Sequence, residues 1–309
     1  MDPHDPSDLL LRRAAEEQGW SDDELARHTR SGHLARLRPG AYLLGGPPTA
    51  EETRHRLLVH ATLAGLRRPA AVSHQSAAVL LGLPVWGAGL GRVHVTRRPP
   101  ASSEVGRYLR CHVARLGDDE VVEVDGLPVT APTRTLLDLG RSLPLGAAVV
   151  SLDAALFQRL VHPAELAAGL AAITGTRGSR AAARAVRFAD GRSESVGESR
   201  SRVLLHRLGL GPSTLQLPIS TSSGVFLGRA DFAWEQARVV GEFDGRIEYG
   251  RLLRPGQEPG DAVFEEKRRE DAVRAEDWGV VRWTWADLTP AVLGPRVRRA
   301  LAWAGRRAG

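Results

Sequence analysis

Three carboxylates have the types and spacing of a metal site. Glu242 and Asp244 end an apolar run in VVGEFDG, and Asp231 lies upstream in RADFAW. Residues two apart on a strand point to the same face of a sheet, so Glu242 and Asp244 are expected to share a face. Like charges held together repel, and a divalent cation relieves that repulsion. Oxygen ligands suit Mg²⁺, so the pattern predicts a Mg²⁺ or Mn²⁺ site, with the Phe243 carbonyl as a third oxygen.

The elements that would position these acids fill the last part of the chain. The pattern predicts a helix at 193–210 that carries Glu198, and then the strands GVFLGRADFAW and ARVVGEFDG. A charged helix at 262–278, an apolar strand at 280–285 and a final helix at 286–305 follow. This order predicts an α/β sandwich with a mixed sheet over residues 179–309.

The order of elements and the acids resemble the PD-(D/E)XK nuclease superfamily, and in particular the domains related to very-short-patch mismatch repair endonucleases. The resemblance covers about residues 193–290 and rests on Glu198, Asp231 and the EFDG segment. It implies a restriction-endonuclease-like fold that hydrolyses phosphodiester bonds with Mg²⁺ or Mn²⁺. Asp231 and Glu242 would hold the metal, while Glu198 would hold a metal-bound water or support the ligands.

One position departs from that superfamily. A lysine usually follows two residues after the glutamate, where this chain has Asp244. All 42 basic residues except Lys267 are arginine. Lys267, or Arg268 beside it, is a candidate substitute that would stabilise the developing charge. Alternatively, Asp244 is a further metal ligand, or the domain is inactive and EFDG is a strand-ending turn with exposed acids.

The first 48 residues have the outline of a winged helix-turn-helix. Helices are expected at 9–18 and from the capping box Ser21–Glu24 to about Arg30, followed by the alternating wing HLARLRPGAYLL. With AVSHQSAAVLLGLP downstream, the segment resembles the winged-helix domain of type IV abortive-infection antitoxins over about residues 8–140. The resemblance implies an α+β region at 49–175 and a cognate toxin. Four arginines would contact phosphates or bases, or else serve only solubility: Arg27, Arg30, Arg36 and Arg38.

Two histidine-containing patterns point less clearly to a site. Ser73 and His74 suggest a nucleophile and base, but no acid partner is evident and Ser73 suits a helix N-cap. His94 and His112 lie on separate predicted strands and could meet. Two histidines alone make a poor metal site.

Composition and charge limit the class of protein and its cellular compartment. The net charge of +6 permits nucleic-acid binding without demonstrating it, and the single cysteine excludes a disulfide framework. The N-terminus lacks a signal-peptide core and no apolar run is long enough for a membrane span. We therefore expect a cytoplasmic, DNA-associated α/β and α+β protein with nuclease activity in bacterial defence or repair. The alternative function is that of a non-enzymatic antitoxin-type regulator with an inactive nuclease-like fold. A homodimer is compatible with either function.

Overall fold

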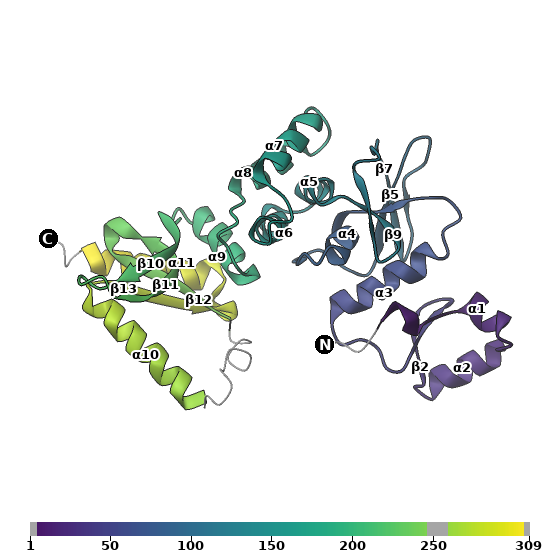
Figure 1. Cartoon of the computed structure of the whole chain (residues 1–309), viewed down its shortest axis with the longest axis horizontal. Helices are drawn as coiled ribbons and strands as arrows, with labels where there is room; N and C mark the ends of the chain where they lie inside the picture. Colours follow the sequence, from purple (N-terminus) through teal and green to yellow (C-terminus); the bar gives the residue numbers. More distant parts are fainter. Residues whose placement is uncertain (1–4, 246–258, 306–309) are drawn as a thin grey trace. The chain divides into compact units, whose positions relative to one another are not determined.

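The computed structural model describes residues 5–245 and 259–305 (Figure 1). The chain divides into two compact units. The first comprises Met1–Ser151 and Arg159–Arg187, and the second comprises Leu152–Gln158 and Phe188–Gly309. The expected mixture of helices and mixed sheets is present. The predicted segment 1–48 falls in the first unit, and so does 49–175 except for Leu152–Gln158, which belong to the second unit.

The N-terminal part of the first unit has two helices and a small antiparallel sheet of order β1-β3-β2. The elements are η1 (Pro6–Asp8), β1 (Leu9–Leu11), α1 (Arg12–Glu17), α2 (Asp22–Arg30), β2 (Leu34–Arg38) and β3 (Ala41–Leu44). The capping box from Ser21 to Glu24 is confirmed. The helix expected at 9–18 begins only at Arg12, because the three leucines before it pair with β3 as a strand.

A mixed sheet of order β6-β7-β5-β4-β9-β8 follows. Strands β5 and β7 are parallel, as are β4 and β9. The turn between β8 and β9 has Asp125 and Gly126 at positive φ, the conformation that an Asp-Gly hairpin turn adopts. The elements are α3 (Glu51–Leu63), β4 (Ala71–Val72), α4 (His74–Leu80), β5 (Val93–Arg97), β6 (Glu104–Val105), β7 (Leu109–Val113), β8 (Val121–Val124) and β9 (Leu127–Thr130).

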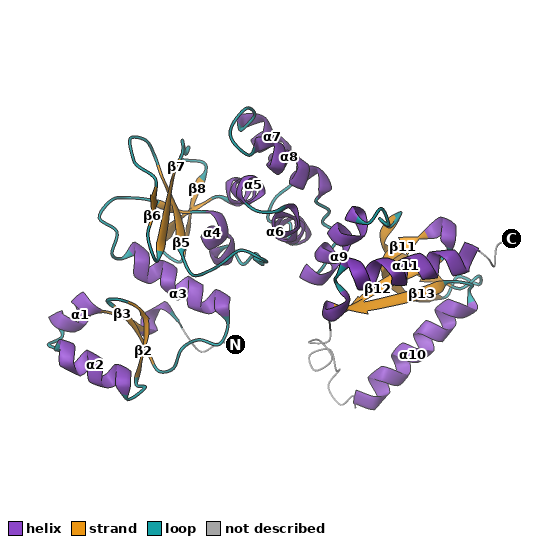
Figure 2. Ribbon diagram, turned by 180° about the vertical axis from the view of Figure 1, so that it is seen from behind, coloured by secondary structure: helices purple, strands orange, loops and turns teal. Residues whose placement is uncertain are grey.

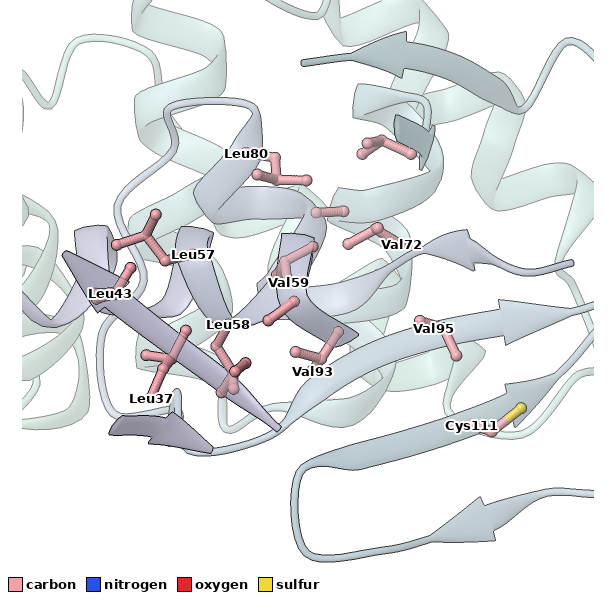
Figure 3. Packing of buried hydrophobic residues seen from close by; sticks show 14 residues of the cluster. Leu37, Leu43, Leu57, Leu58, Val59, Val72, Leu80, Val93, Val95 and Cys111 are labelled. Atoms are coloured by element: carbon pink, nitrogen blue, oxygen red, sulfur yellow. The ribbon is translucent and has the colours of Figure 1, made fainter. Parts of the chain in front are cut away.

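One hydrophobic core joins the β2–β3 hairpin, the segment expected to form a wing, to this sheet (Figure 3). Leu37 and Leu43 of the wing pack in the same cluster as Leu57 of α3 and Val93 and Val95 of β5. The wing is therefore anchored to the rest of the first unit by buried apolar side chains. Helices α5 (Pro132–Ser142), α6 (Leu145–Phe157), α7 (Pro163–Ala172) and α8 (Ser179–Phe188) follow in the chain.

The second unit has a mixed sheet of order β10-β11-β12-β13. The first three strands are antiparallel, and β12 pairs with β13 in parallel. A parallel pair needs a crossover, which here contains α10. The elements are α9 (Val196–Arg207), β10 (Thr214–Ser220), β11 (Phe226–Trp234), η2 (Glu235–Ala237), β12 (Val239–Asp244), α10 (Pro259–Ala275), β13 (Gly279–Thr284), η3 (Trp285–Asp287) and α11 (Pro290–Gly305).

Helices cover both faces of this sheet (Figure 2). Phe232 packs with residues of α9 and α11, including Leu205 and Leu293. Its neighbour Ala233 packs on the other face with Val273 of α10. Alternation along β11 therefore supplies two apolar faces, which gives the expected α/β sandwich. Within the described ranges, no helix combines the length and apolar character needed to cross a membrane.

Candidate functional site

Asp231 and Glu242 lie on neighbouring antiparallel strands, near the carboxyl end of β12. The register pairs Phe232 with Gly241, and extending it by one residue places Asp231 opposite Glu242. Residues opposite each other direct their side chains to the same face. The Phe243 amide donates a hydrogen bond of 2.8 Å to Oδ2 of Asp231. We call Glu198, Asp231, Glu242 and Asp244 the acidic strand end.

Asp231 lies in an electrostatic environment that disfavours its charged form. Burial raises its pKa from 3.8 to about 7, and the neighbouring carboxylates of Glu198 and Glu242 act in the same direction. The Phe243 amide opposes this rise only in part. A carboxylate in these surroundings is stabilised by a nearby cation.

Glu198 is held by donors of the chain itself. It lies in the first turn of α9, whose N-cap Ser195 donates to Oε1 at 2.8 Å. Gln216 of β10 donates to Oε2 at 2.8 Å. Gln216 has a φ of 55°, a conformation that concentrates at functional sites when the residue is not glycine. Because these bonds occupy both carboxylate oxygens, Glu198 is suited to support the ligands Asp231 and Glu242 rather than to bind a metal itself.

Glu242 is bound by two arginines that sequence reasoning missed. Arg269 of α10 donates to Oε1 at 3.1 Å. Arg282 forms an ion pair with Oε2 at 2.8 Å, and its position on β13 is set by the parallel register that pairs it with Glu242. Each oxygen of this carboxylate therefore contacts a guanidinium. No sequence signal separated these two arginines from the many others.

Lys267 lies on the same helix as Arg269 and is exposed. Residues two apart on a helix do not face the same side, so α10 turns Arg269, rather than Lys267, toward Glu242. Arg268 is also exposed. Asp244 is the last residue of β12, paired with Thr284, and its two-residue offset places it on the same strand face as Glu242.

The chemistry of the donors fits a magnesium ion. Mg²⁺ takes oxygen ligands and usually binds one or two carboxylates together with several waters. Asp231 and Glu242, with the Phe243 carbonyl, supply such a set. In the described part of the chain, however, the group of three side chains with ligand atoms within 4.8 Å of one another is His74, His94 and His112. The acidic strand end does not form a group of that kind.

His74, His94 and His112 lie in separate segments of the sequence but form one group in the structure. Ser73 is the N-cap residue of α4, but its side chain makes no cap bond and instead lies 3.0 Å from Nδ1 of His74. Burial lowers the pKa of His94 to about 3 and that of His112 to about 4, and it also lowers the pKa of His74. All three imidazoles are therefore neutral at pH 7.

The four arginines of the winged segment have different surroundings. Arg27 and Arg30 are exposed on α2, and Arg36 is exposed on β2. Arg38 is half-buried and donates to the carbonyl of Ala61 in α3. Three of the predicted nucleic-acid residues are therefore accessible to a phosphate backbone, whereas Arg38 ties the wing to α3.

Comparisons with known proteins identify relatives of part of the chain. No family model matches it. It is 37% identical over 121 residues to the uncharacterized proteins Rv2248 and MT2308 of Mycobacterium tuberculosis, a match that covers 39% of this chain and 44% of each relative. The match thus spans less than half the length of these relatives. The crystal structure of the RV2827C protein of M. tuberculosis aligns with a TM-score of 0.38 and 14% identity, over 58% of this chain and 71% of the other.

Proposed function

We propose that the protein binds nucleic acid and hydrolyses phosphodiester bonds at the acidic strand end, in bacterial defence or DNA repair. The observation that carries the proposal is the 2.8 Å hydrogen bond from the Phe243 amide to Asp231. It holds the Asp231 carboxylate against the strand that bears Glu242. Two carboxylates and a carbonyl oxygen on adjoining strands form the donor set that a hard divalent cation prefers.

Each residue of the acidic strand end would have a distinct role in hydrolysis. Asp231 and Glu242 would hold the cation, which would neutralise charge on the phosphoryl group and lower the pKa of a bound water. Glu198, buried and fixed by Gln216, would support these ligands from within the fold. Arg282, beside Glu242, offers a guanidinium fork that suits a phosphate oxygen pair. It thereby supplies positive charge that a lysine at position 244 would otherwise bring.

The exposed arginines of the first unit support the nucleic-acid part of the proposal. Arg27 and Arg30 lie three residues apart near the end of α2, so they are neighbours on the helix surface. Arg36 projects from the wing strand. Arginine contacts to phosphates fix the position of a protein on nucleic acid without reading its sequence.

A non-enzymatic regulator of the antitoxin type is the second candidate. The ion pairs of Glu242 with Arg269 and Arg282 favour it, because they neutralise the carboxylate without a metal. Asp244 in place of the usual lysine also favours it. In that case the second unit would bind nucleic acid or a cognate toxin without cutting.

A plasmid-nicking assay in Mg²⁺ or Mn²⁺ separates the two candidates. The wild type is compared with Asp231→Ala, Glu242→Ala and the matched control Asp271→Ala, which removes an exposed acid of α10. The proposal expects both site variants to lose more than about 100-fold in rate, as for residues that hold a metal, while the control keeps its activity.

The same assay also identifies the regulator. If pure wild-type protein binds nucleic acid but cuts no plasmid, mismatched duplex, single-stranded DNA or RNA in either metal, hydrolysis is refuted. Equal cutting by the wild type and Asp231→Ala would point to a contaminating nuclease and would equally refute the proposed site.

A further inference from the structure

Three histidines from three separate elements meet on one side of the mixed sheet of the first unit. His94 lies on β5, His112 on β7, and His74 is the first residue of α4. The parallel register of β5 and β7 pairs Thr96 with His112, so His94 and His112 occupy the same face. The ring of His74 stacks on that of His112 with a centroid separation of 3.8 Å.

The ring nitrogens have the spacing of ligands around one ion. Nδ1 of His94 and Nε2 of His112 are 3.1 Å apart, and one nitrogen from each of the three rings lies within 4.8 Å of the others. Nitrogens bound to tetrahedral Zn²⁺ at 2.0–2.1 Å lie about 3.3 Å from one another. We propose that His74, His94 and His112 form a binding site for a divalent transition-metal ion, with Zn²⁺ as the preferred metal. The His74 ring is stacked on that of His112, so binding requires it to tilt until its nitrogen points at the ion while Nδ1 stays within reach of Ser73.

The partners of the histidines suit this role. Metal-binding histidines usually contact a polar group through the second ring nitrogen, which fixes the ring orientation. The side-chain amide of Gln75 lies 2.9 Å from Nε2 of His94. That amide presents either a donor or an acceptor after a half turn, so it can accept the proton that Nε2 carries once Nδ1 binds the metal.

His74 has an equivalent arrangement. Its Nδ1 is 3.0 Å from the Ser73 hydroxyl, which itself accepts a hydrogen bond of 2.8 Å from Thr96. With the His74 proton on Nδ1 and donated to Ser73, Nε2 keeps a free lone pair for the metal. His74 also has a φ of 54°, and such backbone conformations in non-glycine residues cluster at ligand sites.

Open space borders the cluster on two sides. One cavity of about 480 Å³ and another of about 520 Å³ are both lined by His74, Arg110 and His112. A three-nitrogen site next to such space keeps a coordination position for water or an exchangeable ligand, as catalytic zinc sites do. This access distinguishes the cluster from a closed, purely structural one.

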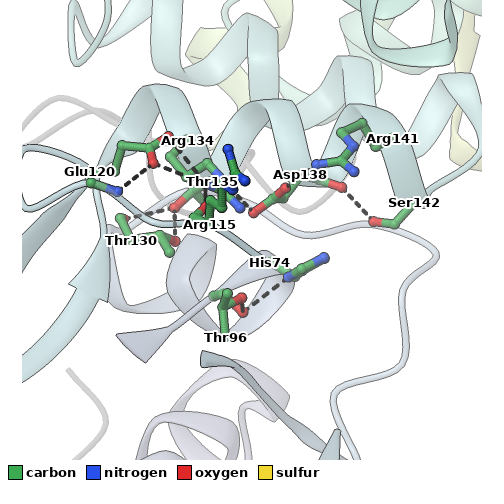
Figure 4. A network of polar contacts seen from close by, with 12 residues as sticks. His74, Thr96, Arg115, Glu120, Thr130, Arg134, Thr135, Asp138, Arg141 and Ser142 are labelled. Atoms are coloured by element: carbon green, nitrogen blue, oxygen red, sulfur yellow. Dashed lines mark hydrogen bonds and ion pairs between the residues drawn. The ribbon is translucent and has the colours of Figure 1, made fainter. Parts of the chain in front are cut away.

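The arginines near the cluster are paired only in part. Figure 4 shows His74 beside the polar network of α5. In that network Asp138 binds Arg134 at 2.9 Å and Arg141 at 3.2 Å. Arg110 on β7 is exposed to solvent, where its charge is screened. Pairing with Asp138 offsets part of the charge of Arg134 and Arg141, whereas Arg92 and Arg110 add positive charge near His94 that the three nitrogen ligands must overcome to hold a dication.

The test measures metal binding directly on the full, untagged chain after removal of metal with EDTA. Calorimetric titration with Zn²⁺ in excess Mg²⁺, and the visible absorption of bound Co²⁺, should each report one equivalent per chain. His112→Gln and His94→Gln should weaken binding at least about tenfold, and Gln75→Leu should weaken it by about 10–100-fold while all three ligands stay in place.

Controls separate this site from the acidic strand end and from misfolding. His206→Gln, which changes an exposed histidine of α9, should bind the metal as the wild type does, and Asp231→Ala should keep the Zn²⁺ equivalent that His112→Gln loses. Circular dichroism without metal shows whether His112→Gln keeps the fold. The proposal is overturned if the wild type binds neither Zn²⁺ nor Co²⁺, or if folded His112→Gln binds them as tightly as the wild type.

Discussion

Replacing Asp231 with asparagine should remove a pH-dependent destabilisation of the second unit. Asparagine keeps the shape of the side chain and an oxygen that can accept from the Phe243 amide, but it cannot ionise. In the wild type, burial and the neighbouring Glu198 raise the pKa of Asp231 from 3.8 to about 7. The substitution therefore isolates the cost of holding this carboxylate ionised without a cation.

The sign and size of the effect follow from that rise in pKa. Below about pH 3 the carboxyl of Asp231 is mostly protonated in the folded and unfolded states alike. As the pH increases toward 7, the unfolded state ionises while the folded state keeps the proton, so the free energy of unfolding falls. At about 1.4 kcal/mol for each pH unit, the loss reaches about 4 kcal/mol above pH 7.

Denaturant unfolding measures this loss. Tryptophan fluorescence reports mainly on the second unit, which holds Trp234, Trp278, Trp283, Trp285 and Trp303. With EDTA present, the stability advantage of Asp231→Asn over the wild type should grow by about 3 kcal/mol between about pH 5 and pH 8. Mg²⁺ should recover part of the wild-type stability at about pH 8, since a ligand that binds only the folded state stabilises it.

Two outcomes would refute the reasoning. The first is an advantage of Asp231→Asn that is the same at both pH values, because Asp231 would then keep an ordinary pKa. The second is an equal pH-dependent advantage for Asp271→Asn, since that acid is exposed on α10 and has no comparable surroundings.

Two further substitutions test the packing and the nucleic-acid surface. A methyl group at Gly197 would overlap the ring of Phe243, so Gly197→Ala should lower the free energy of unfolding of the second unit by about 1–3 kcal/mol, as measured by denaturant unfolding; an unchanged midpoint would contradict this packing. Arg36→Ala should weaken nucleic-acid binding and reduce its logarithmic salt slope by about 1 in fluorescence anisotropy titrations. Arg38→Ala should instead lower thermal stability, because its guanidinium donates to the Ala61 carbonyl; the reverse pattern for these two arginines would show that their roles are exchanged.

Local chemistry allowed much of the fold to be predicted. The capping box at Ser21 and the Asp125-Gly126 turn depend on residues close in sequence, and the predicted capping box is confirmed. The alternation around Phe232 gave the two apolar faces of β11. The leucines at 9–11 were assigned to a helix because their partners in β3 lie far along the chain, and pairing over that distance leaves no local pattern.

The candidate sites show the same division. The two-residue spacing of Glu242 and Asp244 indicated acids on one face of a strand, which needs only the period of a strand. The register of β11 and β12 decided that Asp231 lies opposite Glu242. Lys267 stands out because it is the one lysine of the chain. The rotation of α10 about its axis nevertheless turns Arg269, not Lys267, toward Glu242. Which of many arginines meets a carboxylate depends on helix rotation and strand register, and neither is encoded in residue type.

The sequence by itself determined which groups this protein has for chemistry: carboxylates at a strand end, arginines on a predicted helix and wing, and histidines in separate segments. Only the tertiary structure decided which of them meet. His74 joins His94 and His112 because α4 starts where β5 and β7 run side by side. Short-range propensity sets each element, whereas packing of the apolar faces sets the distances between elements, and those distances determine which side chains can act together.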